Sequence, residues 1–240
     1  MEAAAAPKPK PRTMASILAE WPSLARYWRV LAREGRLPDP DTVTVYCTAP
    51  PPGYAIPPTA GGAALPGEGL VWFRECPPHP AIFIHEAIHL AEKRPPASAA
   101  VEPSEEYYAH NGTATIIALE RLGILDQTEG NPLRLLEELT IDLIRDEYAR
   151  WRASGAPRYI GAPQPHCLTE ELLYNGILVP IPSPGPASGP CEAEASARGT
   201  GYEYYTAWLI WLHAAGTPAT AEVAARIALR LLGGGKGQHA

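Results

Sequence analysis

Hydrophobic and polar positions follow two different periods along the chain, and this difference separates predicted helices from predicted strands. Apolar residues recur at helical spacing across 13–36, with a break before Pro22. The alternating, β-branched segment 41–49 predicts a strand, and LVWFREC at 70–76 predicts a second one. Between them, the Pro- and Gly-rich segment 50–69 predicts a long loop.

The remaining patterns predict mainly helices. Apolar spacing, caps and prolines indicate helices at 81–92, 104–123, 131–154 and 169–174, followed by a C-terminal helical pair at 202–216 and 217–233. The segment 131–154 is expected to be the longest helix, because Asn131 can cap it and Pro132 suits its first turn. We therefore predict a mostly helical α+β fold. In it, a small sheet packs on the 81–92 helix and a following glutamate-bearing helix, with additional C-terminal helices.

Composition narrows the range of functions. The 240-residue chain has a formal net charge of -6 and scattered basic residues, which argues against a nucleic-acid partner. It has no apolar run of about eighteen residues and no apolar centre of a secretory signal near its start. We therefore expect a cytoplasmic protein with no membrane partner. The scarcity of Met, Asn and Gln is typical of a GC-rich genome or of a thermophile.

The four cysteines are Cys47, Cys76, Cys167 and Cys191, and no two of them have CxxC spacing. This spacing excludes a zinc ribbon and leaves either free thiols or up to two disulfides. Because disulfides are rare inside cells, we favour free or partly paired thiols.

The segment AIFIHEAIHLAE at 81–92 places three polar residues inside an apolar helical pattern. His85 and His89 are four residues apart, which on a helix is about 40° of rotation and about 6 Å of rise, so both imidazoles can reach one metal ion. Glu86 projects about 100° away and can act on a metal-bound water. The competing interpretation is a core helix whose polar groups are satisfied by hydrogen bonds. Burying three such groups together is costly, so we favour a zinc site.

A catalytic zinc ion needs a third protein ligand and an open fourth position. Glu106 lies seventeen residues after His89, in the first turns of the next predicted helix, and Ala109 one turn later would allow a close approach. Glu105 and Glu102 are alternative carboxylates. His110 is an alternative ligand, or a residue that would hydrogen-bond to a ligand and hold it in place.

His85, Glu86 and His89, with a glutamate on the following helix, resemble the gluzincin metallopeptidases, and most of all the archaeal minigluzincins. The resemblance covers about 70–122 and implies a Zn²⁺ endopeptidase that hydrolyses peptide bonds of a polypeptide substrate. A metal-activated water would attack the carbonyl while Glu86 serves as general base. The resemblance also implies that an edge strand before the metal helix pairs with substrate, and 70–76 occupies that place. The thermolysin-type second motif is absent.

A transition-state donor is also required, and Tyr148 and His166 are the main candidates, with Tyr204 and Tyr205 as further ones. The alternative function is a zinc-binding, non-proteolytic or latent regulator on the same scaffold, and a helical interaction protein without metal is a third interpretation. The sequence does not indicate an oligomeric state.

The predicted organisation is a single metallopeptidase-like domain at 13–233. It has a core at 41–123 and a helical extension at 131–233 that contains a flexible loop at 180–198. A disordered arm at 1–12 and a flexible tail at 234–240 flank this domain.

Overall fold

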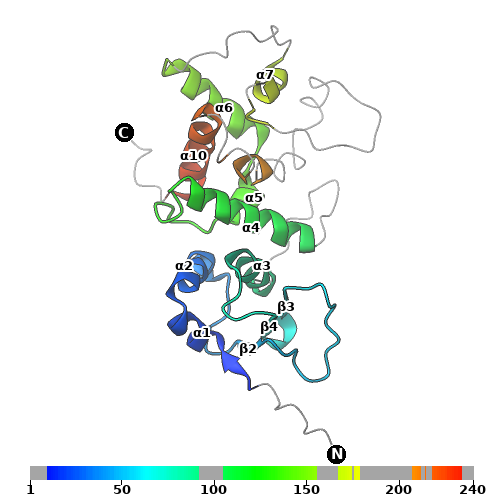
Figure 1. Cartoon of the computed structure of the whole chain (residues 1–240). Coiled ribbons are helices and arrows are strands. Elements are labelled where there is room, and N and C mark those ends of the chain that lie inside the picture. The colour runs from blue at the N-terminus through cyan, green and yellow to red at the C-terminus, as the bar shows by residue number, and fades with distance from the viewer. Residues whose placement is uncertain are drawn as a thin grey trace, which may run out of the picture. The chain divides into compact units, whose positions relative to one another are not determined.

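The computed structural model describes residues 10–91, 105–155, 167–174, 176–178, 207–211, 214 and 218–233. The chain divides into two compact units, Met1–Lys93 and Arg94–Ala240, and each is described by itself (Figure 1). The mostly helical α+β fold predicted from the sequence is confirmed. Residues 1–9, the predicted loop at 180–198 and the tail at 234–240 lie outside the described residues, and the single domain at 13–233 stays a prediction.

The first unit contains a small mixed sheet. Its strands are β1 (Arg12–Thr13), β2 (Thr44–Cys47), β3 (Gly62–Leu65) and β4 (Leu70–Phe73), arranged in the order β1-β2-β4-β3. Strand β2 runs parallel to β4, while β1 and β3 are antiparallel to their neighbours. The helices of this unit are α1 (Met14–Glu20), α2 (Pro22–Leu31) and α3 (Pro80–Leu90), with short 3-10 turns at Arg33–Gly35 and Pro66–Glu68. The expected helical break before Pro22 is confirmed.

Aromatic packing joins the sheet to two helices in the core of this unit. The ring of Phe83 on α3 stacks on Phe73 of β4 at 6.0 Å between centroids, and it lies 6.4 Å from the ring of Trp28 on α2. All three side chains are buried. Burial of such large apolar side chains contributes about 1.5–3 kcal/mol each, so this cluster fixes α3 against β4.

The prediction for 50–69 was wrong in one respect, because residues 62–65 form the edge strand β3 rather than loop. The sequence GAAL has no β-branched residue, so its strand propensity is low. The strand is stabilised instead by its hydrogen-bonded pairing with β4, in which Gly62 lies opposite Phe73 and Leu65 lies opposite Leu70. The expected edge strand at 70–76 is also corrected, since β4 lies between β2 and β3.

The loop that leads from β2 to β3 is tied to the sheet. The Arg74 side chain donates from Nε to the carbonyl oxygen of Ala60 at 2.7 Å and lies over the ring of Trp72. The Tyr54 hydroxyl donates to the Glu68 carboxylate, and this hydrogen bond is the main reason why the pKa of Tyr54 is raised. The first contact holds the end of the loop just before β3, and the second ties the loop to the turn just after β3.

The preference for free or partly paired thiols was wrong. Cys47 at the end of β2 and Cys76 after β4 form a disulfide, with 5.8 Å between their Cα atoms. Because β2 and β4 are parallel neighbours, these distant cysteines reach the same end of the sheet. Cys167 is also disulfide-bonded. No helix in the described part of the chain is both long enough and apolar enough to cross a bilayer.

The second unit is helical in its described residues. It contains α4 (Glu105–Arg121), α5 (Arg134–Glu138), α6 (Ile141–Ala153), α7 (Leu168–Tyr174), a short helical segment at 207–211 and α10 (Pro218–Leu232). Helix α10 packs against α5 and α6. The buried Glu147 on α6 pairs with Arg150 at 2.8 Å and with Arg230 of α10 at 2.9 Å, so a charge-assisted contact also joins these two helices.

The single long helix predicted at 131–154 is instead two helices, α5 and α6. Leu139 is extended, and Thr140 caps α6 by accepting a hydrogen bond from the Leu143 amide at 3.2 Å. Asn131 accepts from the Leu133 amide at 2.9 Å, and so it organises the turn that precedes α5. The break therefore comes from a threonine cap that competes with helix continuation.

Candidate metal centre

Helix α3 carries the predicted metal motif, and local interactions explain why it begins where it does. Pro80 occupies the first turn, where a missing amide hydrogen costs nothing. His79 precedes it and accepts a hydrogen bond from the Ala81 amide at 3.2 Å through Nδ1. The buried Phe83 and Leu90 then anchor the helix in the core of its unit.

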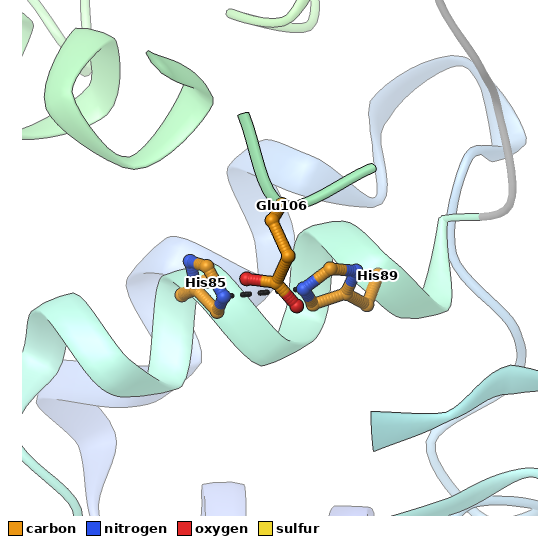
Figure 2. Close-up of side chains that lie close together, drawn as sticks. All are labelled: His85, His89 and Glu106. Atoms are coloured by element: carbon orange, nitrogen blue, oxygen red, sulfur yellow. Dashed lines mark hydrogen bonds between the residues drawn. The ribbon is translucent and has the colours of Figure 1, made fainter. Parts of the chain in front are cut away.

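The side chains of His85 and His89 lie on the same side of α3 and face each other. Their Nε2 atoms are 3.1 Å apart, and their rings are nearly perpendicular at 77° (Figure 2). Both side chains are half-buried. Two nitrogens bound to one tetrahedral zinc ion at about 2.0–2.1 Å would lie about 3.3 Å apart. The pair therefore fits two ligands of one metal ion with little adjustment, and it also fits a hydrogen bond between one protonated and one unprotonated nitrogen.

Glu86 is next to this pair but points in a different direction from the two histidines. Its side chain is only 6% exposed, and its carboxylate lies against the backbone of Gly62 on the edge strand β3. On the helix, Glu86 directly follows His85 and projects about 100° around the axis from it. The motif residues of α3 thus divide into a histidine pair and a separate acidic group.

The predicted third ligand lies in the second unit. Glu106 and the alternative Glu105 are both exposed residues in the first turn of α4, and Ala109 one turn later is buried. Figure 2 labels Glu106 with the two histidines, and the three residues offer nitrogen and oxygen donors of the kinds that zinc binds. The positions of the two units relative to one another are not determined. The choice of Glu106 over Glu105 therefore stays a prediction.

The other predicted site residues are distributed between the second unit and residues outside the description. His110 is exposed on α4. Tyr148 is buried on α6, where its hydroxyl donates to Glu171 of α7 at 2.8 Å and its ring lies near that of Trp151. His166 lies outside the described residues, as do Tyr204, Tyr205 and Glu102. A transition-state donor therefore stays a prediction.

Two features beside the motif were missed by the reasoning from sequence. Gly61 and Gly62 lie directly against α3, and the Cys47–Cys76 disulfide fixes the chain four residues before α3 begins. The Gly-Gly pair is visible in the sequence, but it lies in the Pro- and Gly-rich segment 50–69, whose composition predicts a loop. A pair of small residues before an alanine-rich segment indicates close approach of another element, and this is the signal that was available.

Comparison of the chain with models of protein families, with curated proteins and with solved structures gave no match. The function is therefore argued from the residues of the site.

Proposed function

We propose that this protein is a zinc-dependent peptidase of the gluzincin type, similar to the archaeal minigluzincins. The observation that carries the proposal is the pair of Nε2 atoms of His85 and His89, which lie 3.1 Å apart on the helix that also carries the buried Glu86. A core helix would satisfy such groups separately. Here two nitrogens lie close together, and the next residue after His85 is a buried glutamate, which supports a metal site with an acidic group on the same helix.

In this proposal His85, His89 and Glu106 hold the metal. Two neutral imidazoles and one carboxylate are a common ligand set of catalytic zinc, and they leave a fourth position open. When bound, zinc would polarise the carbonyl of a scissile peptide bond and lower the pKa of a water molecule at the open position.

Glu86 moves the proton in the proposed reaction. One carboxylate oxygen takes a proton from the attacking water, and the same group later gives that proton to the nitrogen of the leaving amine. Its burial supports this role, because a buried carboxylate has few alternative orientations and so stays positioned for proton transfer. The proposed substrate is an unstructured polypeptide.

Zinc content and peptide cleavage by the Glu86→Gln variant together test the proposal. We expect about one zinc ion per chain in both wild type and Glu86→Gln, and cleavage of an unstructured polypeptide that falls by about 100-fold or more in the variant. Glu75→Gln is the matched control, because Glu75 is an exposed acidic residue of the same unit. Unchanged turnover in Glu86→Gln would contradict the mechanism.

Two results with the wild-type protein separate the competing functions. Wild-type protein without stoichiometric zinc would contradict the metal site itself. Wild-type protein that holds zinc but cleaves no polypeptide would contradict the peptidase and support the non-proteolytic regulator.

A further inference from the structure

Two consecutive glycines, Gly61 and Gly62, lie beneath one face of α3. A Cβ atom on Gly61 would lie 2.2 Å from Ile82 Cδ1, and one on Gly62 would lie 2.7 Å from Glu86 Oε1. Ile82 and Glu86 are one helical turn apart, so the two glycines face two successive positions of the same helix face. We propose that Gly62 is a positioning residue, whose missing side chain sets where the Glu86 carboxylate lies. This inference rests on the proposed function, in which Glu86 is the general base.

The strand cannot easily move away from an added methyl group. Strand β3 pairs with β4 along its whole length, and Gly62 lies opposite Phe73. The Arg74 amide donates to the carbonyl oxygen of Gly61 at 2.9 Å, which extends the pairing by one residue. Displacing β3 would break several of these hydrogen bonds and leave their backbone groups unpaired.

Helix α3 is equally fixed on the other side of this contact. Phe83 is fully buried, and it packs against Phe73 of β4 and Trp28 of α2. Because packed cores resist displacement, α3 cannot rise away from β3 without opening a cavity around Phe83. The carboxylate of Glu86 is therefore the group that an added methyl at Gly62 would displace.

Rotation of the carboxylate alone would not relieve the clash. A Cβ on Gly62 would also lie 2.8 Å from Glu86 Cγ and 3.0 Å from Glu86 Cδ, so the whole side chain would have to shift. Glu86 is buried, which limits the other rotamers that it can adopt. The backbone of Gly62 lacks the positive φ that would exclude alanine, so Gly62→Ala changes this position through its methyl group alone.

Gly61 supplies a matched control for this substitution. An added Cβ at Gly61 would meet only the terminal methyl of Ile82 at 2.2 Å, since the next nearest atom is 3.5 Å away. That methyl group is the end of a flexible apolar side chain and can rotate. Gly61→Ala therefore adds the same methyl group one residue away without displacing Glu86.

Steady-state kinetics of Gly62→Ala and Gly61→Ala on an unstructured polypeptide test the inference. We expect Gly62→Ala to lower kcat by about 10- to 100-fold, because a misplacement of about 1 Å costs about that much. KM and zinc content should stay close to wild type, since neither depends on the base, and Gly61→Ala should keep a nearly normal kcat. Equal kcat values for the two variants would overturn the inference.

A second measurement does not depend on activity. Gly62→Ala should lower Tm in the wild-type background, and this loss should largely disappear in a Glu86→Ala background, which removes the three atoms nearest to the new methyl group. Gly61→Ala should change Tm equally in both backgrounds. Equal changes in Tm for Gly62→Ala in both backgrounds would overturn the inference. A wild-type protein that cleaves no polypeptide would contradict the proposed function, but the Tm measurement would still test the role of Gly62.

Discussion

His85 and His89 lie on consecutive turns of α3 with their Nε2 atoms 3.1 Å apart. Both imidazoles belong to one rigid helix, whose buried residues fix it against the sheet. The helix therefore fixes the positions of their Cα atoms, and the contact between the two rings brings the nitrogens together. In the proposed metal site, such a pair would lose little side-chain freedom on binding an ion.

We predict that His85→Ala and His89→Ala each lower zinc affinity by more than about 100-fold, because losing even an outer-shell partner costs about 10- to 100-fold. His79→Asn is the control, since His79 lies before the same helix and caps it, and asparagine keeps a capping oxygen. Competition with a chromogenic chelator measures the affinities. A loss of affinity in His79→Asn as large as in His89→Ala would point to a general effect on α3.

A second prediction concerns the third ligand. Glu106→Ala should weaken zinc binding far more than Glu105→Ala does, although both residues are exposed in the first turn of α4. The two variants remove the same group from adjacent positions, so their effects on helix α4 should be similar. Calorimetric titration with zinc measures both affinities, and the reverse order would reassign the ligand to Glu105.

The Cys47–Cys76 disulfide should contribute to stability. It closes a segment with a sequence separation of 29 residues, and the loop-closure relation gives about 3–4 kcal/mol for a ring of that size. We predict that the double variant Cys47→Ser/Cys76→Ser loses about this much free energy of unfolding in a denaturant titration without reductant. A free energy of unfolding equal to that of wild type would show that the disulfide does not restrain the unfolded chain.

The fourth prediction follows from the lowered pKa of Glu222. Hydrogen bonds from Arg226 and then from the buried Trp151 hold this pKa below its usual value. A carboxyl group with a lowered folded-state pKa stabilises the fold above its unfolded pKa, and this contribution is lost as the pH falls through the folded value. Glu222→Gln should therefore lower the free energy of unfolding at neutral pH, by about 0.5–1 kcal/mol for so exposed a carboxylate, and by less at about pH 3.

Denaturant titrations at both pH values measure the effect of Glu222→Gln. Glu138→Gln is the control. Glu138 forms an exposed ion pair with Arg134 on the same helix, so the substitution removes a similar surface pair. If Glu222→Gln lowers the free energy of unfolding by the same amount at both pH values, the effect does not come from the charge of Glu222.

Most helices could be predicted from the sequence because local signals mark them. Pro22 divides α1 from α2, and the apolar spacing of 169–174 and 217–233 predicts α7 and α10 within a residue or two at each end. Strand β3 could not be predicted, because GAAL forms a strand only through pairing with β4. The break at Thr140 was predictable in principle, since Thr140 followed by Asp142 is a cap signature that competes with the longer helical pattern.

Some features of the candidate site follow from local sequence, and others depend on contacts between distant parts of the chain. The convergence of His85 and His89 follows from a spacing of four residues on a helix. The burial of Glu86 against Gly62 depends on which strand forms the sheet edge, and no local pattern specifies this. The proposed third ligand follows the segment 92–104, which lies outside the described residues, so spacing alone cannot choose between Glu106 and Glu105.

The Cys47–Cys76 disulfide also determines what a cut in the chain can do. The bond turns 47–76 into a covalent ring that contains the β2–β3 loop and the strands β3 and β4. Cleavage of this loop by any protease would leave both fragments joined. Such a nicked protein would migrate as one species without reductant and as two with it, and β3 would still be linked covalently to the segment that precedes α3.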